Sequence, residues 1–176
     1  MSDLRSYREC VRIIICKDNL VLLGERRYSD GTLMYYEFPG GGVEKDETIS
    51  DTVKRESLEE VGMVVDNVRS LDIRYSYNIS YNNPTRAKKY KGGNDVWCVC
   101  DFVKQDHSLH GKDGDALPYK WVPVEEAINL IKNGPPSKYN QARLEALDKV
   151  RRLNRSNKVF ISFVKEGNKR LKLSDW

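Results

Sequence analysis

The sequence has no long apolar run, only two histidines, and four cysteines among its 176 residues. No stretch approaches the length needed to cross a bilayer, and the first ten residues lack the apolar segment of a signal peptide. We therefore expect no membrane association and a cytoplasmic location. Repeats, low-complexity tracts and linkers are also missing, which predicts one domain with a core over about 8–153 and a C-terminal extension over about 154–176.

The few cysteines and histidines do not match a zinc-site pattern. Cys98 and Cys100 stand two residues apart in a strand-like run, so they point to one face, a poor arrangement for a disulfide. No second cysteine pair has zinc-finger spacing, and only His107 and His110 could add ligands. We expect buried thiols in a reducing compartment.

Charge is abundant but unevenly placed. Hydrophobic residues make up 39% of the chain and charged residues 32%, which is typical of a globular domain rather than a disordered chain. The net charge is +4, with basic residues concentrated over 86–91 and 149–172 and acidic residues over 44–60. An acidic cluster in a basic protein predicts a cation site surrounded by groups that attract anions.

The apolar pattern predicts one α/β (α+β) domain with a mixed sheet. Helices are predicted over 48–61, 124–131 and about 138–153, the first capped by Thr48 and ended by Gly62. A long loop is predicted over 78–94. Alternating or continuous apolar runs predict strands over 11–16, 20–23, 32–38, 64–76, 95–103 and 119–122, and a final hairpin over 159–164 and 171–173.

Three glutamates on the first helix carry the strongest functional signal. Glu56, Glu59 and Glu60 stand at i, i+3 and i+4 and share one face, where like charges cost about 0.2–0.5 kcal/mol per pair. The alternative is a solvated acidic face. Ile49 and Val53 lie on the same arc, however, so the carboxylates point toward the protein, where a hard divalent cation would balance them.

Arg55 adds a second observation. It can reach Glu59 one turn along the helix or Glu47 in the preceding loop, and so hold a carboxylate in position. The alternative is an ordinary surface ion pair, which contributes little to stability.

Taken together, the glycine, glutamates and arginine of the segment Gly41–Met63 resemble the Nudix box of Nudix hydrolases. Ser57 departs from the pattern, because the family usually has an aliphatic residue there. Upstream, 36–41 (Tyr-Glu-Phe-Pro-Gly-Gly) is similar to the family's aromatic lead-in, with Tyr36 where tryptophan is frequent. The resemblance covers roughly 11–132. Its fixed positions are Gly41, Glu47, Arg55, Glu56, Glu59, Glu60 and Gly62, followed by apolar Met63.

The resemblance implies a Nudix-like α/β/α sandwich with a mixed central sheet, extended here by the C-terminal helix and hairpin. It also implies a Mg²⁺ site, with Mn²⁺ as a substitute, made by Glu56, Glu59, Glu60 and the backbone carbonyl of Gly40. Glu56 is the candidate to help deprotonate the attacking water. In the same pattern, Glu47 and Arg55 would orient the ligands.

Many family members add an acidic residue from a loop before a tryptophan-containing strand. Asp113 and Asp115 precede Trp121 here and are candidates for that role. A plain turn over 112–115 is the alternative.

The implied activity is hydrolysis of a phosphoanhydride bond in a substrate that contains a nucleoside diphosphate. Arg86, Lys88 and Lys89 in the segment 81–91 are candidates for a phosphate clamp, with a solvated loop as the alternative. Tyr36 and Trp97 are candidates to stack a base, although strand aromatics more often fill cores.

The substrate class stays open at this point. We favour a small nucleotide, such as a (d)NTP, ADP-ribose or a dinucleoside polyphosphate, because the basic residues do not form one track. The alternatives are an RNA 5′-end or cap pyrophosphohydrolase, and a non-catalytic nucleotide-sensing module. The C-terminal hairpin is a candidate homodimer edge.

Overall fold

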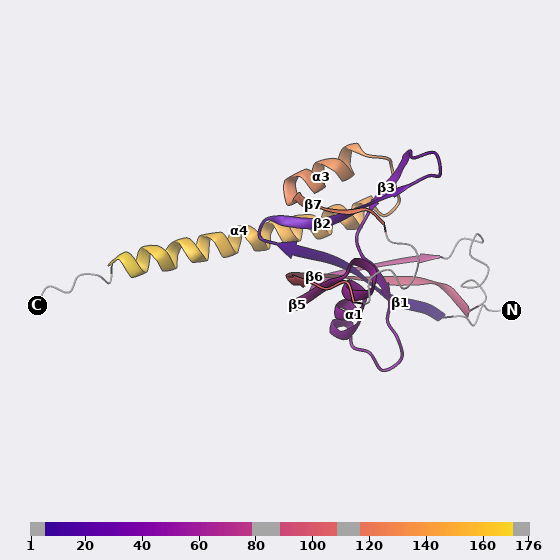
Figure 1. Ribbon diagram of the computed structural model, residues 1–176, viewed down its shortest axis with the longest axis horizontal. Coiled ribbons are helices and arrows are strands. Elements are labelled where there is room, and N and C mark those ends of the chain that lie inside the picture. The colour runs from indigo at the N-terminus through magenta and orange to yellow at the C-terminus, as the bar shows by residue number, and fades with distance from the viewer. Residues whose placement is uncertain (1–5, 79–88, 109–116, 171–176) are drawn as a thin grey trace, which may run out of the picture.

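The computed structural model describes residues 6–78, 89–108 and 117–170, with side chains as far as residue 156. Figure 1 shows a sheet with helices on both faces. The strands are β1 (Ser6–Lys17), β2 (Leu20–Arg27), β3 (Leu33–Glu37), β4 (Gly40–Gly42), β5 (Met63–Asn78), β6 (Tyr90–Gln105) and β7 (Tyr119–Pro123). The helices are α1 (Ile49–Val61), α3 (Val124–Asn133) and α4 (Asn140–Arg170).

The sheet is mixed, as predicted, and two different strands pair with one edge of β1. Its strand order is β3-β2-β1-β6-β5, with β4 on β1 and β7 on β2. β1 and β6 run parallel, and the other pairs are antiparallel. β2 pairs with β1 only at Cys16 and Lys17, whereas β4 pairs with the same strand at Cys10–Arg12. One edge of β1 is therefore shared between two different parts of the chain.

Alternate residues of β1 enter two separate cores, because successive side chains of a strand point to opposite faces. Val11, Ile13 and Ile15 pack on the side of α1, together with Val53. Ile14 packs on the other side with residues of α3 and α4. The predicted α/β/α arrangement is confirmed.

Helix α1 begins and ends where the sequence predicts. The Thr48 hydroxyl accepts a hydrogen bond from the Asp51 amide, and the Asp51 carboxylate accepts one from the Thr48 amide. These reciprocal bonds satisfy amides that the first turn leaves without helical partners. Gly62 ends the helix in the left-handed region, at φ 63°. Ser57 is fully buried, and its hydroxyl has no hydrogen-bond partner in the described part of the chain.

Several predicted boundaries are wrong. β1 begins at Ser6 rather than at residue 11, and β2 continues to Arg27 rather than ending at residue 23. β6 begins at Tyr90 rather than at residue 95, because 90–94 pair with the start of β1. The strand expected over 159–164 is instead helical, since α4 continues to Arg170 beyond the main body (Figure 1). Extending an existing helix needs no new nucleus, and this outweighs the weak strand preference of valine, isoleucine and phenylalanine. The second hairpin strand, 171–173, lies outside the described residues, and dimerisation stays a prediction.

All four cysteines are buried, as expected. Burial raises the pKa of Cys16 to about 12 and that of Cys98 to about 11, so these thiols stay protonated near neutral pH. Among the described residues, no helix is both long enough and apolar enough to cross a membrane.

The capping contacts of α1 give the first prediction. Thr48→Ala removes the hydroxyl that accepts from Asp51, so the free energy of unfolding should fall by about 1 kcal/mol. Urea denaturation measures this change. Thr48→Ser keeps the hydroxyl and should lose much less stability, and equal losses in both variants would contradict the capping role.

Candidate active site

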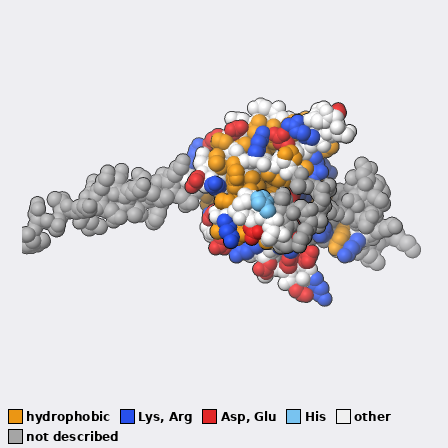
Figure 2. Space-filling model, viewed as in Figure 1, with side chains coloured by type: hydrophobic (Ala, Val, Ile, Leu, Met, Phe, Trp, Pro, Cys, Tyr) orange, Lys and Arg blue, Asp and Glu red, His pale blue; other side chains and the backbone are white. Residues whose placement is uncertain are grey.

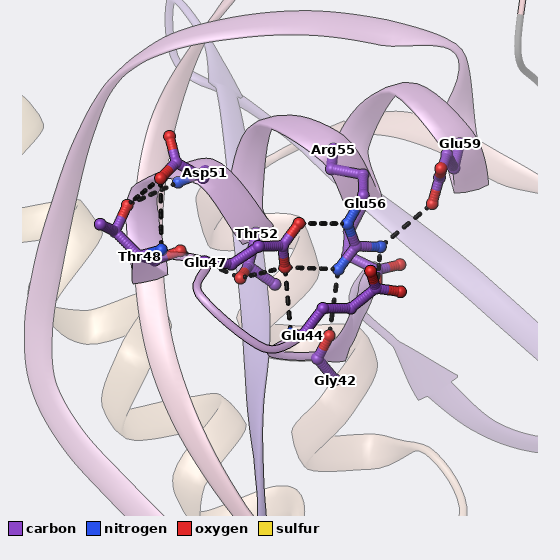
Figure 3. A network of polar contacts seen from close by, with 9 residues as sticks. All are labelled: Gly42, Glu44, Glu47, Thr48, Asp51, Thr52, Arg55, Glu56 and Glu59. Carbon is purple, nitrogen blue, oxygen red and sulfur yellow. Dashed lines mark hydrogen bonds and ion pairs between the residues drawn. The ribbon is translucent and has the colours of Figure 1, made fainter.

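Arg55 is the centre of the predicted site (Figure 3). Its Nε and Nη2 donate to the two carboxylate oxygens of Glu47, at 2.7 and 2.9 Å. Nη1 donates to Glu56 at 2.7 Å and to Glu59 at 3.0 Å, and Nη2 also donates to the Gly42 carbonyl at 3.0 Å. A guanidinium has five N–H donors, and these five bonds use them all.

Glu47 joins the loop before α1 to the helix itself. Besides Arg55, it accepts hydrogen bonds from the Thr52 hydroxyl at 2.9 Å and from the Glu44 amide at 3.1 Å. The bonds from Arg55 are the main cause that lowers the pKa of Glu47 to about 2. Glu47 is therefore a fixed anion that orients Arg55.

Glu60 is held against the glycine strand β4. Its two carboxylate oxygens accept from the Gly40 amide at 2.8 Å and from the Tyr119 hydroxyl at 2.6 Å. Burial raises the pKa of Glu60, and the negative charges of Glu37 and Glu56 act in the same direction. A bound cation would relieve this unfavourable environment of the ionised form.

Glu56 lies directly over the glycine backbone. A Cβ on Gly41 would come within 2.1 Å of its Oε1, so only glycine leaves room for the carboxylate in this position. Burial raises the pKa of Glu56, and the charge of Glu59 adds to the effect, while Arg55 and Arg8 oppose it. Gly40 is equally constrained, because a Cβ there would lie 2.1 Å from the Val11 carbonyl oxygen.

The donor set fits a hard divalent cation. Three carboxylates and a glycine backbone offer the oxygen ligands that Mg²⁺ prefers. In the described ranges, no three acidic, histidine or cysteine side chains are grouped closely enough to hold a metal ion as they stand. Arg55 and Tyr119 instead hold the glutamates by hydrogen bonds. Figure 2 shows acidic side chains gathered at the lower edge of the surface, where α1 and its leading loop lie.

A cavity of about 140 Å³ lies on the other face of the sheet, between its strands and the start of α4. Its walls contain four tyrosines, Phe38 and Trp97, together with Arg12, Glu37, Asp95 and Arg143. Glu37 links the cavity to the carboxylates, because its charge raises the pKa of both Glu60 and Tyr119. The site thus combines an acidic edge with an aromatic cavity.

The structure brings the predicted carboxylate set together, but it separates the predicted stacking residues. Glu47, Arg55, Glu56 and Glu59 form one network, with Glu60 beside Gly40. Trp97 lines the cavity. Tyr36 packs against the core instead, and its neighbour Tyr35 lines the cavity. The Lys89 ammonium lies 5.3 Å from the Tyr90 ring. Outside the described residues lie Arg86, Lys88, Asp113 and Asp115.

Sequence reasoning missed two residues of the site. Tyr119 reaches Glu60 from 59 positions away, and Arg8 stands close to Glu56 from the start of β1. No local spacing signals either contact, because each depends on strands that meet only in the folded sheet. A strand tyrosine can equally serve a core.

Comparison with known proteins decides the family. A family model described as the NUDIX domain matches residues 6–144 of the chain. The chain belongs to the NUDIX family. An RNA pyrophosphohydrolase of Hydrogenovibrio crunogenus is 28% identical to this Nudix protein over 159 residues, covering 82% of this chain and 91% of the relative. Another RNA pyrophosphohydrolase, from Psychromonas ingrahamii, is 31% identical over 144 residues, covering 74% and 77%.

Solved structures confirm the fold. An ADP compounds hydrolase superposes with a TM-score of 0.62 at 20% identity, covering 88% of this chain and 76% of that one. A NUDIX hydrolase from Nitrosomonas europaea gives 0.60 at 17% identity, covering 85% and 91%. Together with the family match and the curated relatives, this confirms the predicted Nudix-type pyrophosphohydrolase as the class of this enzyme.

The Arg55 network gives the second prediction. Arg55→Lys keeps the charge of the Nudix site but has three donors instead of five, so at least two bonds to charged or carbonyl groups are lost. We expect the free energy of unfolding to fall by about 1.5–3 kcal/mol.

Guanidinium chloride denaturation measures the loss, and the adjacent residue provides a matched control. Lys54 makes an exposed ion pair with Asp66 at 3.2 Å, so Lys54→Arg should change stability by less than about 0.5 kcal/mol. Equal effects of the two substitutions would contradict the structural role of Arg55.

The lowered pKa of Glu47 gives a third prediction, about acid stability. Because the pKa is about 2 in the folded state and near 4.5 otherwise, the ionised Glu47 stabilises the fold above about pH 4.5. This contribution declines as pH falls toward 2.

The stability difference between wild type and Glu47→Gln should therefore shrink between pH 6 and pH 3, as measured by urea denaturation at each pH. A constant difference over this interval would show that Glu47 is not held ionised by Arg55.

Proposed function

We propose that this Nudix hydrolase is a Mg²⁺-dependent pyrophosphohydrolase of nucleoside 5′-polyphosphates. The observation that carries the proposal is the placement of Glu56 and Glu60 against the glycines of β4, with Arg55 ordering Glu56 and Glu59. These carboxylates and the Gly40 carbonyl would hold the metal. When bound, Mg²⁺ neutralises phosphate charge and lowers the pKa of a coordinated water.

The protein's own groups have distinct parts in this reaction. Glu56 is the candidate base, because burial raises its pKa and a carboxylate with a higher pKa accepts a proton from water more readily. Glu47 and Arg55 position the helix carboxylates without touching substrate. The glycine backbone of β4 leaves space for a phosphate group beside them.

The cavity supports a nucleoside as the group attached to the phosphates. Its volume of about 140 Å³ is close to that of a protein cavity known to take up a benzene ring, about 150 Å³. Aromatic walls suit a planar base, and Glu37 joins this cavity to the carboxylate edge. A cytoplasmic location, where such nucleotides and Mg²⁺ are found together, fits this proposal.

RNA with a 5′-polyphosphate end is the second candidate substrate. It is favoured by the relatives named RNA pyrophosphohydrolase, at 25–31% identity. The terminal nucleoside of such an RNA presents the same chemistry to the cavity and the carboxylates. The remaining chain would lie along the surface, where binding should weaken steeply with salt.

The proposed function gives a fourth prediction. With Mg²⁺, wild type should hydrolyse at least one of four substrates. Nucleoside triphosphates or 5′-triphosphorylated RNA would release phosphate or pyrophosphate, ADP-ribose would give AMP and ribose 5-phosphate, and dinucleoside polyphosphates would give two nucleotides. Glu59→Gln should reduce kcat/KM by more than about 100-fold, because it removes a metal-binding charge. Chelation of the metal should abolish turnover, and Mn²⁺ should restore it.

Glu145→Gln is the matched control, since Glu145 is an exposed glutamate of α4. It should leave the rate unchanged. Turnover on RNA alone would identify the second candidate. Retained turnover in Glu59→Gln, or silence across the whole panel, would contradict the proposed function.

A further inference from the structure

Two neighbouring side chains of the aromatic cavity each keep one polar atom without a partner. Asp95 and Trp97 stand two residues apart on β6, so they lie on the same face of the strand, and both line the cavity. Oδ1 of Asp95 and Nε1 of Trp97 are buried and have no hydrogen-bond partner in the described part of the protein. The side chain of Asp95 is 6% exposed, and Trp97 is 3% exposed.

Such atoms are costly to bury unless something in the cavity pairs with them. A buried polar group without a partner costs about 1–3 kcal/mol. The cost falls here on an acceptor and a donor whose residues stand two apart on one strand and line one cavity, and the edge of a nucleobase offers a donor and an acceptor to complement them. A ligand with a donor next to an acceptor would satisfy both atoms at once.

The orientation of Asp95 is fixed by Arg12, another residue of the cavity wall. Its Oδ2 accepts from Nε of Arg12 at 2.8 Å, and Arg12 also lies 3.6 Å from Glu37. Because one oxygen is taken by Arg12, the other oxygen is the one available to a ligand. Asp95 thus presents a charged acceptor and no donor.

Arg143 supplies a second donor at the cavity wall. It is 5% exposed, and its guanidinium stacks 5.1 Å from the Tyr35 ring. Its Nη1 donates to Ser137 and Asn140, at 3.1 and 3.0 Å. Within the described residues it has no carboxylate partner at ion-pair distance, so its charge is available to acceptor atoms of a ligand.

Guanine fits these three groups better than the other bases. Its N1–H and N2–H donate side by side, which suits a lone carboxylate oxygen, and O6 and N7 accept from nitrogen donors such as arginine. Adenine presents a single amino donor and no carbonyl oxygen. Uracil and cytosine lack the second ring that would reach both Asp95 and Arg143.

We propose that Asp95, Trp97 and Arg143 read guanine as the base of the hydrolysed nucleotide. The Asp95 carboxylate accepts from N1–H and N2–H, the Trp97 indole donates to O6, and Arg143 faces the remaining acceptors. The inference rests on the proposed function, because it names the base of that same substrate. It applies equally to a free nucleotide and to the first nucleotide of an RNA.

The test compares kcat/KM for GTP, ITP, ATP, CTP and UTP with Mg²⁺. Wild type should prefer GTP over ATP by about 10-fold or more, since a good base-specific pair discriminates by about 1–3 kcal/mol. ITP, which lacks the N2 amino group, should fall between them. The preference should appear mainly in KM, because the reacting phosphates are the same.

Two variants test the assignment of the atoms. Trp97→Phe keeps an aromatic ring but removes Nε1–H, and should reduce the preference for GTP about fivefold. In Asp95→Asn, Arg12 still requires an acceptor, so the amide oxygen turns toward Arg12 and the NH₂ group toward the cavity. The acceptor becomes a donor, and the ratio of kcat/KM for GTP to kcat/KM for ATP should fall to about one.

Each variant has a matched control. Trp121 packs on Phe102 in the other core, and Asp101 pairs with Arg69 on the same strand as Asp95. Trp121→Phe and Asp101→Asn should keep the base preference of wild type. Thermal unfolding confirms that each variant is folded before its kinetics are compared.

The outcomes separate the two proposals. Equal kcat/KM for all bases, or a preference for adenine or a pyrimidine, would overturn guanine reading while leaving the hydrolase function intact. If no substrate turns over, the proposed function fails. Calorimetric binding of GMP against AMP then decides the base preference directly, and equal affinities would overturn guanine reading in that case too.

Discussion

The hydrogen bonds of the Arg55 guanidinium determine how the acidic edge of the candidate site is arranged. Three glutamates on one helical face repel one another, and a fourth approaches from the loop before the helix. Arg55 bonds Glu47, Glu56 and Glu59 simultaneously and fastens the helix to the Gly42 carbonyl. A lysine could balance some of this charge, but its three N–H donors could not make all five hydrogen bonds. The network therefore fixes where the carboxylates stand before any cation arrives.

A second constraint comes from the way β1 divides its edge between β2 and β4. The glycines of β4 come close enough to β1 that a Cβ on Gly40 would collide with the Val11 carbonyl. This close approach brings the glycine backbone beneath Glu56 and Glu60. On the other face, Arg12 of the same strand bridges Asp95 and Glu37. One strand thus links the charged edge with the aromatic cavity.

What could be predicted from the sequence is what depends on local spacing. Thr48, Gly62 and the three helix glutamates act over one or two turns, so their positions along α1 determine their geometry. Tyr119 could not be assigned to Glu60, because 59 residues separate them and only strand pairing brings them together. The same holds for Arg12 and Asp95, 83 residues apart. The prediction of a strand over 159–164 failed for a different reason. It relied on local side-chain preference, which is weaker than the tendency of an existing helix to continue.

In the proposed function, residues with local contacts on α1 would serve the chemistry, whereas residues joined by long-range contacts would serve substrate selectivity. The carboxylates of α1 and the Arg55 network would serve any substrate with a phosphoanhydride bond, because in the proposed function they would contact only phosphate and metal. In the proposed guanine reading, selection of the base would depend on the opposite face of the sheet. There, among the described residues, one oxygen of Asp95 and the indole N–H of Trp97 have no hydrogen-bond partner. The Arg12–Asp95 ion pair in the cavity wall therefore determines which oxygen of Asp95 a base would meet. Changing Arg12 would alter which atom of Asp95 the substrate meets, although Arg12 itself need not touch the base.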